Sequence, residues 1–123
     1  MEEPEALETE EALQSVLTSS TDRLFIVKFG AVWCKPCTDL QPSIDALKQE
    51  LSETDRNAQV VLVDRTDDND ELFSKHDITK LPTVLLITNG EVCAKLARPD
   101  PTDMRHKVIS MLPPPALVLD ADF

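Results

Sequence analysis

A pair of cysteines three residues apart is the feature of this sequence most able to do chemistry. They lie in the run Trp33-Cys34-Lys35-Pro36-Cys37, shortly after the apolar segment LFIVKF. The change from an apolar run to helical spacing predicts a strand, a short turn and a helix that opens at Cys34. Unpaired backbone N–H groups and the helix dipole stabilise an anion there, so the Cys34 thiol should ionise easily. Cys37 follows one turn later on the same face, close enough to attack a bond formed at Cys34.

The residues between the two sulfurs favour the same chemistry. Lys35 adds a cation that stabilises a neighbouring thiolate. Pro36 fixes the backbone and has no N–H to lose in the first helical turn. The spacing therefore predicts a nucleophile and a resolving thiol.

Two other interpretations of the pair are a metal site and an inert pair of thiols. A metal site needs more ligands, and only Cys93, His76 and His106 remain, without a second C-x-x-C motif. An inert pair of buried thiols is common in proteins but does not account for the strand-to-helix context. We therefore favour a redox-active pair, and we expect no metal, flavin or nucleotide cofactor.

Length and charge limit the remaining classes of function. The 123 residues suit one domain, which we expect to span residues 1–112, followed by a proline-rich tail at residues 113–123. A net charge of -11 repels phosphate backbones and anionic lipids, so we expect neither nucleic acid nor a membrane as partner. The N-terminal run MEEPEALETEEALQ has no apolar signal core, and cysteine use does not fit a secreted disulfide framework. A cytoplasmic location is the resulting expectation.

Spacing, capping and turn signals predict the elements that position the cysteines. Asn89-Gly90 is a strong hairpin signal. Pro42 predicts a kink but no stop in the helix that begins at Cys34. The other expected helices are Glu10 to about Ser19 after a Thr9 cap, Asp70–His76, and Pro101 to about Met111 after an Asp100 cap; the expected strands are Leu24–Phe29, Gln59–Val63, Thr83–Thr88 and Glu91–Leu96, with a weak edge strand at Glu5–Glu8. This order predicts an α/β fold in which helices cover both faces of a mixed sheet.

Several segments together resemble the thioredoxin family. They are FIVKFGAVWCKPC, Pro42 five residues beyond the second cysteine, ITKLPT and NGEV. The resemblance is ungapped from about Leu24 to Pro42 and extends over roughly nine tenths of the chain, omitting the tail. It implies the thioredoxin fold, a central mixed sheet flanked by four helices, with a cis peptide bond before Pro82 that faces the dithiol.

The resemblance also implies a mechanism. The Cys34 thiolate attacks a disulfide in a partner protein, and Cys37 then attacks the mixed disulfide to release the reduced partner. Trp33 would pack beside the site and form a docking surface with Leu81 and Pro82. The further site-shaping residues are Lys35, Pro36, Thr83 and Arg98. The expected partners are disulfide-containing proteins and a reductase or low-molecular-weight thiol that returns electrons, with the chain acting as a monomer in electron transport and cell redox homeostasis.

Two positions depart from the family. Lys28 lies six residues before Cys34, where thioredoxins usually carry a buried acid that accepts a proton from the resolving cysteine. Either its amine reaches solvent, or it sits under the dithiol as a neutral or paired group that tunes the thiol pKa values. A nearby charge would stabilise thiolates and make the potential less negative than about -270 mV. Arg98 replaces a family glycine and could select acidic partners, or it is an ordinary solvated arginine.

The remaining features leave other possibilities open. We expect Cys93 to be a small packed residue, with a regulatory or dimer-forming thiol as the alternative. Trp33 could be ordinary core. His76 and His106 are taken as surface residues, and DRTDDNDE as a solvated helix start. The apolar tail ALVLDADF packs on its own domain, packs on a partner, or is disordered. The competing hypothesis for the whole chain is a thioredoxin-like binding module with slow or vestigial redox activity, favoured by Lys28 and Arg98.

Overall fold

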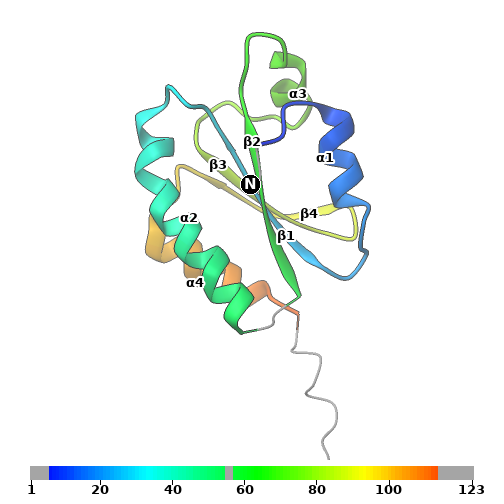
Figure 1. Ribbon diagram of the computed structural model, residues 1–123, viewed down its shortest axis with the longest axis vertical. Coiled ribbons are helices and arrows are strands. Elements are labelled where there is room, and N and C mark those ends of the chain that lie inside the picture. The colour runs from blue at the N-terminus through cyan, green and yellow to red at the C-terminus, as the bar shows by residue number, and fades with distance from the viewer. Residues whose placement is uncertain (1–5, 55–56, 114–123) are drawn as a thin grey trace, which may run out of the picture.

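A four-stranded sheet with helices on both faces forms the centre of the molecule (Figure 1). The computed structural model describes residues 6–54 and 57–113. The elements along the chain are α1 (Glu10–Leu17), β1 (Leu24–Gly30), α2 (Lys35–Glu53), β2 (Ala58–Asp64), α3 (Asp70–Lys75), β3 (Thr83–Thr88), β4 (Glu91–Ala97) and α4 (Pro101–Met111). The predicted α/β class, with helices covering both faces of a mixed sheet, is confirmed.

The strand order in the sheet is β2-β1-β3-β4. β1 pairs with β2 in parallel and with β3 in antiparallel orientation, so it is a central strand. β3 and β4 form the predicted hairpin, in which Asn89 and Gly90 both have positive φ, at 54° and 77°. The end of β1 leads to the cysteines, which places them at one end of the sheet, next to the end of β2.

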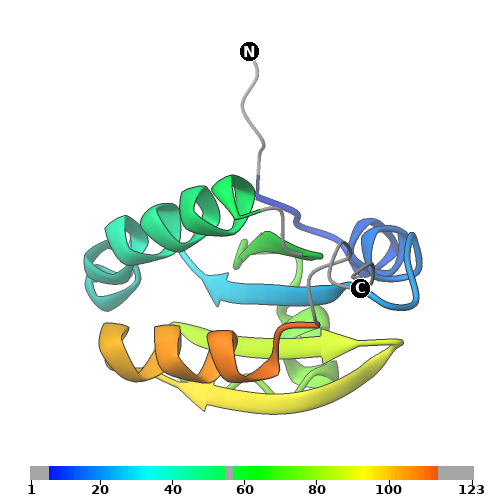
Figure 2. The same cartoon turned by 90° about the horizontal axis from the view of Figure 1, so that it is seen from below.

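Alternate residues of β1 enter two separate cores. Leu24 and Ile26 pack with α2, α4 and β3 on one face, while Phe25, Val27 and Phe29 pack with α1 and α3 on the other. Figure 2 shows α2 and α4 next to each other on their face of the sheet. Because all seven residues of β1 are buried, this strand is a rigid support for whatever follows it.

The ends of several elements differ from the predictions. Cys34 does not belong to α2 but caps it, and the helix continues through Pro42, as expected, to Glu53. α1 ends at Leu17 and not near Ser19, because the hydroxyl groups of Thr18 and Ser19 bond back to carbonyls of the last turn.

The weak edge strand predicted at the N-terminus is reduced, within the described residues, to one bridge. Leu7 pairs in parallel with Val63: its N–H donates to the Leu62 carbonyl at 2.7 Å, and its carbonyl accepts from the Asp64 N–H at 3.0 Å. Glu5, like the tail after Pro113, lies outside the described residues. Along residues 6–54 and 57–113, no helix has the length and apolar character needed to span a membrane.

Two predictions about single residues are wrong. His76 is half-buried rather than a surface residue, because its Nε2 lies 2.8 Å from Glu10 Oε1 and its ring lies against Phe29. Cys93 is exposed rather than packed, because β4 is an edge strand and a register shift leaves Cys93 without a partner opposite. His106 is exposed, as expected.

Candidate active site

Cys34 and Cys37 form a disulfide at the N-terminus of α2, with their Cα atoms 5.3 Å apart. The Cys34 sulfur accepts a hydrogen bond from the Cys37 backbone N–H at 3.2 Å, which is the N-cap interaction of the helix. The same backbone donor would stabilise a thiolate on Cys34 in the reduced protein, in line with the prediction of an easily ionised thiol. Cys34 is 7% and Cys37 2% exposed, so Cys37 is the more enclosed of the two.

The two cysteines line different spaces. Cys34 lies in an open groove of about 470 Å³, together with Trp33 and Leu81. Cys37 lines a smaller cavity of about 220 Å³ behind the disulfide, together with Lys28 and Asp64. A partner can therefore approach Cys34 along the groove, whereas Cys37 lies on the inner side.

The turn before β3 forms part of the groove. The Leu81–Pro82 peptide bond is cis, as the resemblance implied. The Pro82 carbonyl accepts from the Arg98 backbone N–H at 2.8 Å, and Thr83 Oγ1 donates to the Lys80 carbonyl at 2.6 Å. One hydrogen bond thus lies within the turn, and another connects the turn to Arg98, the residue that follows β4.

Trp33 is 71% exposed at the rim of the groove, which excludes the alternative that it belongs to the core. A large apolar side chain in that position supplies contact area for a docked segment. Lys35 is also exposed, and its Nζ lies 2.7 Å from Asp39 Oδ1. Because this carboxylate partly neutralises it, Lys35 acts less strongly on Cys34 than its position in the sequence implies.

Arg98 has a left-handed backbone with φ of 48°. Such a conformation is favourable for glycine and costs other residues about 1–2 kcal/mol, in agreement with the glycine that the resemblance implies at this position. The Arg98 side chain is held over the groove, where its Nε donates to the Leu81 carbonyl at 3.0 Å. It is therefore not a freely solvated arginine.

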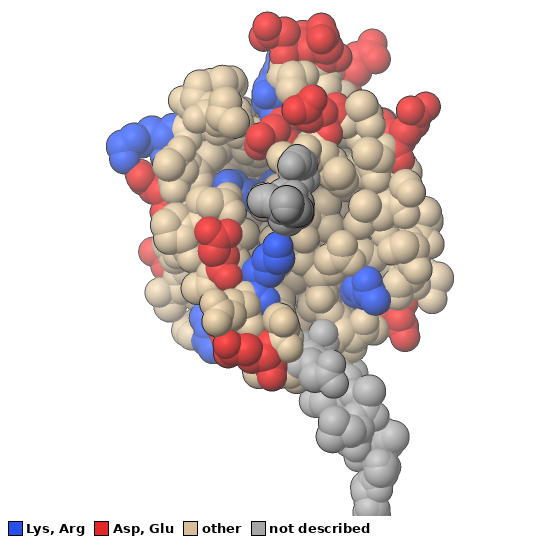
Figure 3. Space-filling view, in the orientation of Figure 1, with Lys and Arg blue, Asp and Glu red and all other residues tan. Residues whose placement is uncertain are grey.

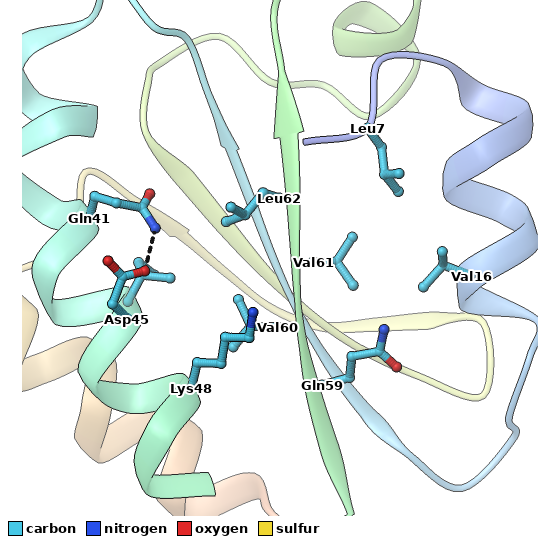
Figure 4. A pocket seen from close by; sticks show the side chains of 10 residues that line it. Leu7, Val16, Gln41, Asp45, Lys48, Gln59, Val60, Val61 and Leu62 are labelled. Atoms are coloured by element: carbon cyan, nitrogen blue, oxygen red, sulfur yellow. Dashed lines mark hydrogen bonds between the residues drawn. The ribbon is translucent and has the colours of Figure 1, made fainter. Parts of the chain in front are cut away.

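Lys28 sits under the dithiol as a bonded group, the second of the two predicted arrangements. Its Nζ donates to the Cys37 carbonyl at 3.3 Å and to Gln41 Oε1, and the residue is buried. The Gln41 amide nitrogen in turn donates to Asp45 at 2.9 Å (Figure 4). Burial lowers the pKa of Lys28, and the nearby carboxylates of Asp64 and Asp45 oppose this shift without cancelling it.

Gly30 makes room for this inner arrangement. A Cβ atom at Gly30 would lie 3.2 Å from Cys37 Sγ and 3.3 Å from Lys28 Cε. Both distances are below ordinary van der Waals separation, so the backbone at Gly30 approaches the dithiol closely. Cys37 Sγ and Lys28 Cε therefore both border the space next to Gly30.

Sequence reasoning missed several residues that surround the dithiol. Gln41 lies four residues after Cys37, so its position on the same helix face was a usable signal. Asp64 and Arg65 come at and just after the end of β2, which is the neighbour of β1 in the sheet. No comparable sequence pattern pointed to Lys80 as a residue near the dithiol. Of the residues that the structure describes, none form a cluster of three or more His, Cys, Asp or Glu that could bind a metal ion.

The chain is similar to known thioredoxins in sequence and structure. The Thioredoxin family model matches residues 5–110. Thioredoxin of Bacillus subtilis is 30% identical over 79 residues, which are 64% of this chain and 72% of the relative. Thioredoxin of Oryctolagus cuniculus is 33% identical over 85 residues, or 69% and 76%. The solved structure of Fasciola hepatica thioredoxin superposes with a TM-score of 0.75 at 28% identity, covering 85% of this chain and 96% of that one.

These similarities agree with the geometry of the site. The matched residues include both cysteines, the cis-proline turn and the groove between them. The fold, with its four-stranded mixed sheet and four helices, is that of the structural relatives. The chain therefore belongs to the thioredoxin family, and its Cys34–Cys37 pair makes it a thiol-disulfide oxidoreductase.

Proposed function

We propose that the protein reduces disulfide bonds in other proteins, with Cys34 as the nucleophile and Cys37 as the resolving thiol. The observation that carries this assignment is the different exposure of the two sulfurs. Cys34 lines the open groove at a helix N-terminus, while Cys37 lies behind it. A partner disulfide in the groove reaches Cys34 first.

The reaction proceeds in two exchange steps. The Cys34 thiolate attacks one sulfur of the partner disulfide, the S–S bond breaks, and its electron pair leaves on the second sulfur, which takes up a proton. The thiolate of Cys37 then attacks the Cys34 sulfur, and the partner's first sulfur leaves and takes up a proton. The partner gains two electrons and two protons, and the Cys34–Cys37 disulfide is formed.

The groove residues position the partner in this scheme. Trp33 and Leu81 supply apolar contact area, while the cis peptide bond at Pro82 and the Thr83 hydroxyl fix the turn beside Cys34. Pro36 fixes the first turn of α2, where Cys34 is held. These residues act by orienting the partner and not by exchanging protons.

Lys28 acts on the inner side by its charge. A protonated amine close to Cys37 stabilises thiolates and therefore the reduced form, so it makes the couple a stronger oxidant. A protonated Lys28 cannot accept a proton from Cys37, as a carboxylate at this position would. We propose that this charge sets the potential of the couple less negative than about -270 mV, the value for a typical thioredoxin.

The wider setting is part of the proposal. The chain works in the cytoplasm as a monomer, within electron transport and redox homeostasis, and a reductase or low-molecular-weight thiol returns its electrons. Residues 1–112 form the catalytic domain, with residues 113–123 as an appended tail. The relatives are thioredoxins, and the described residues form one sheet with two apolar cores, in agreement with a self-contained domain.

A trapping experiment separates this function from that of a redox-inactive binding module. In the Cys37→Ser variant, attack by Cys34 can no longer be resolved, so a mixed disulfide with a protein such as insulin should accumulate. The matched control is Cys34→Ser/Cys37→Ser, which should trap nothing although Cys93 is still exposed. Equal trapping by both variants would refute the assigned roles, and no trapping by either would favour the binding module.

A further inference from the structure

The groove beside Cys34 has an unusual charge for this protein. The sequence contains 23 Asp and Glu but only 12 Lys and Arg. Nevertheless the groove is lined by four cations, namely Lys35, Arg65, Lys80 and Arg98, and by no described Asp or Glu. The composition would lead one to expect the opposite, about two acids for each base.

Three of these cations are not neutralised by the protein. Lys35 is paired with Asp39, but Arg65, Lys80 and Arg98 form no ion pair with any carboxylate of the described residues. Because no described carboxylate lies within ion-pair distance of these three side chains, their positive charge remains available at the groove.

The two arginines are also held in place. Arg65 Nε donates to the Thr66 carbonyl at 3.3 Å, and its guanidinium lies 5.6 Å from the centre of the Phe73 ring. Arg98 is fixed by its bond to the Leu81 carbonyl. In both, the terminal nitrogens of the guanidinium remain for an incoming carboxylate, and less side-chain freedom is lost when one binds.

We propose that the partner segments selected by this groove carry acidic residues beside the disulfide cysteine. This inference rests on the proposed function and specifies its substrate class. The cations come from three separate segments, after β2, before Pro82 and after β4, around a groove of about 470 Å³. Charges distributed in this way fit an extended protein segment with carboxylates at several positions, rather than a small disulfide.

The charge of the whole chain opposes this preference, and the acidic end of the molecule includes α3, whose Phe73 lines the groove. Acidic side chains gather at the end of the molecule where α3 lies (Figure 3), and the net charge of -11 repels an acidic partner. At physiological ionic strength this field is screened beyond about 8 Å, whereas contacts within the groove are shorter than that. The preference therefore arises from contacts in the groove.

Two disulfide-bridged peptides of equal length, one with Glu and one with Lys beside the cysteines, test the inference. The rate constant kcat/KM for reduction is measured for each at about 0.15 M salt. Flanking charges alter the leaving thiol, so each rate is divided by the rate of reduction by dithiothreitol. The wild-type protein should prefer the acidic peptide, and each cation replaced should lower that preference about two- to fivefold, the range for an exposed ion pair.

The variants are matched in charge. Lys80→Gln is compared with Lys107→Gln on α4, and Arg65→Gln/Lys80→Gln/Arg98→Gln with Lys48→Gln/Lys95→Gln/Lys107→Gln. Only the groove variants should lose the preference. Lys80 is exposed, and its hydrogen bond from Thr83 uses the backbone carbonyl, which the replacement keeps, so the single variant remains informative if the triple variant folds poorly.

The other outcomes would overturn the inference in distinguishable ways. Equal normalised rates for the two peptides would refute the substrate class while leaving the proposed reductase function intact. Reduction of neither peptide would refute the function and the inference with it. Faster normalised reduction of glutathione disulfide than of the acidic peptide would assign the groove to a small anionic disulfide instead of a protein segment.

Discussion

The two sulfurs of the disulfide lie in different surroundings although they are three residues apart. Cys34 lines an open groove with an exposed tryptophan and several cations, whereas Cys37 lines a separate, smaller pocket with Lys28 and Asp64. The groove beside Cys34 is open to solvent. On the inner side, the Lys28 amine and the Gln41 amide are both hydrogen-bonded within the protein. From this difference we propose a division of roles: the outer side selects partners and the inner side sets the energy of the thiolates.

The largest effect should come from removing the outer sulfur. Cys34→Ser removes the nucleophile, so the rate of protein disulfide reduction should fall about a thousandfold or more. Cys93→Ser, which removes the exposed thiol on β4, should leave the rate unchanged. An insulin reduction assay measures both. A comparable loss in the two variants would show that the reaction does not depend on the groove sulfur.

The next largest effect should come from a packing change beside Cys37, compared with a change at the exposed Trp33. Gly30→Val forces a branched side chain against Cys37 and Lys28, where even a Cβ is closer than 3.4 Å to two atoms. Such overpacking should lower the free energy of unfolding by about 1–3 kcal/mol. Trp33→Ala on the outer side should change it by no more than about 0.5 kcal/mol, because Trp33 is 71% exposed. Urea unfolding of the oxidised proteins compares the two, and equal losses would contradict the contrast.

A smaller effect concerns the pH dependence of stability. The pKa of Lys28 is lowered in the folded protein from 10.5, so the unfolded chain binds more protons between the folded value and 10.5. The contribution of Lys28 to the free energy of unfolding should therefore rise with pH between its lowered folded-state pKa and 10.5. The penalty for holding the buried cation is fully present below that pH range. Lys28→Met should remove this rise, as measured by urea unfolding from neutral to alkaline pH, whereas Lys48→Met should retain it.

Local patterns in the sequence predicted much of the fold and the reactive pair. Capping residues, the Asn-Gly turn and apolar spacing are interactions between near neighbours, so Thr9, Asp100 and Asn89 could be interpreted from the sequence alone. The position of Cys34 at the start of α2 follows from the same kind of signal. The resemblance to thioredoxins supplied the cis-proline, which no local pattern distinguishes from a trans one.

The rest depended on tertiary contacts. Arg65, Lys80 and Arg98 are far apart in the sequence and line one groove because the strand directions bring the ends of β2 and β4 and the start of β3 to the same end of the sheet. The bonded state of Lys28 required Gln41 and the Cys37 carbonyl to be placed beneath the dithiol. The position of Cys93 in the strand after the hairpin, between Val92 and Ala94, predicts a packed residue, but an edge position and a register shift are set by the sheet as a whole.

The reduction potential of the Cys34–Cys37 couple tests the division of roles most directly. Wild-type protein and Lys28→Met are equilibrated in glutathione redox buffers, and the fraction of reduced dithiol is read by thiol alkylation. We expect a reversible two-electron couple less negative than about -270 mV, and a more negative value for Lys28→Met, because loss of the cation destabilises the thiolates. A wild-type value below that figure, or an unchanged potential in the variant, would contradict the claim that the inner side tunes the couple.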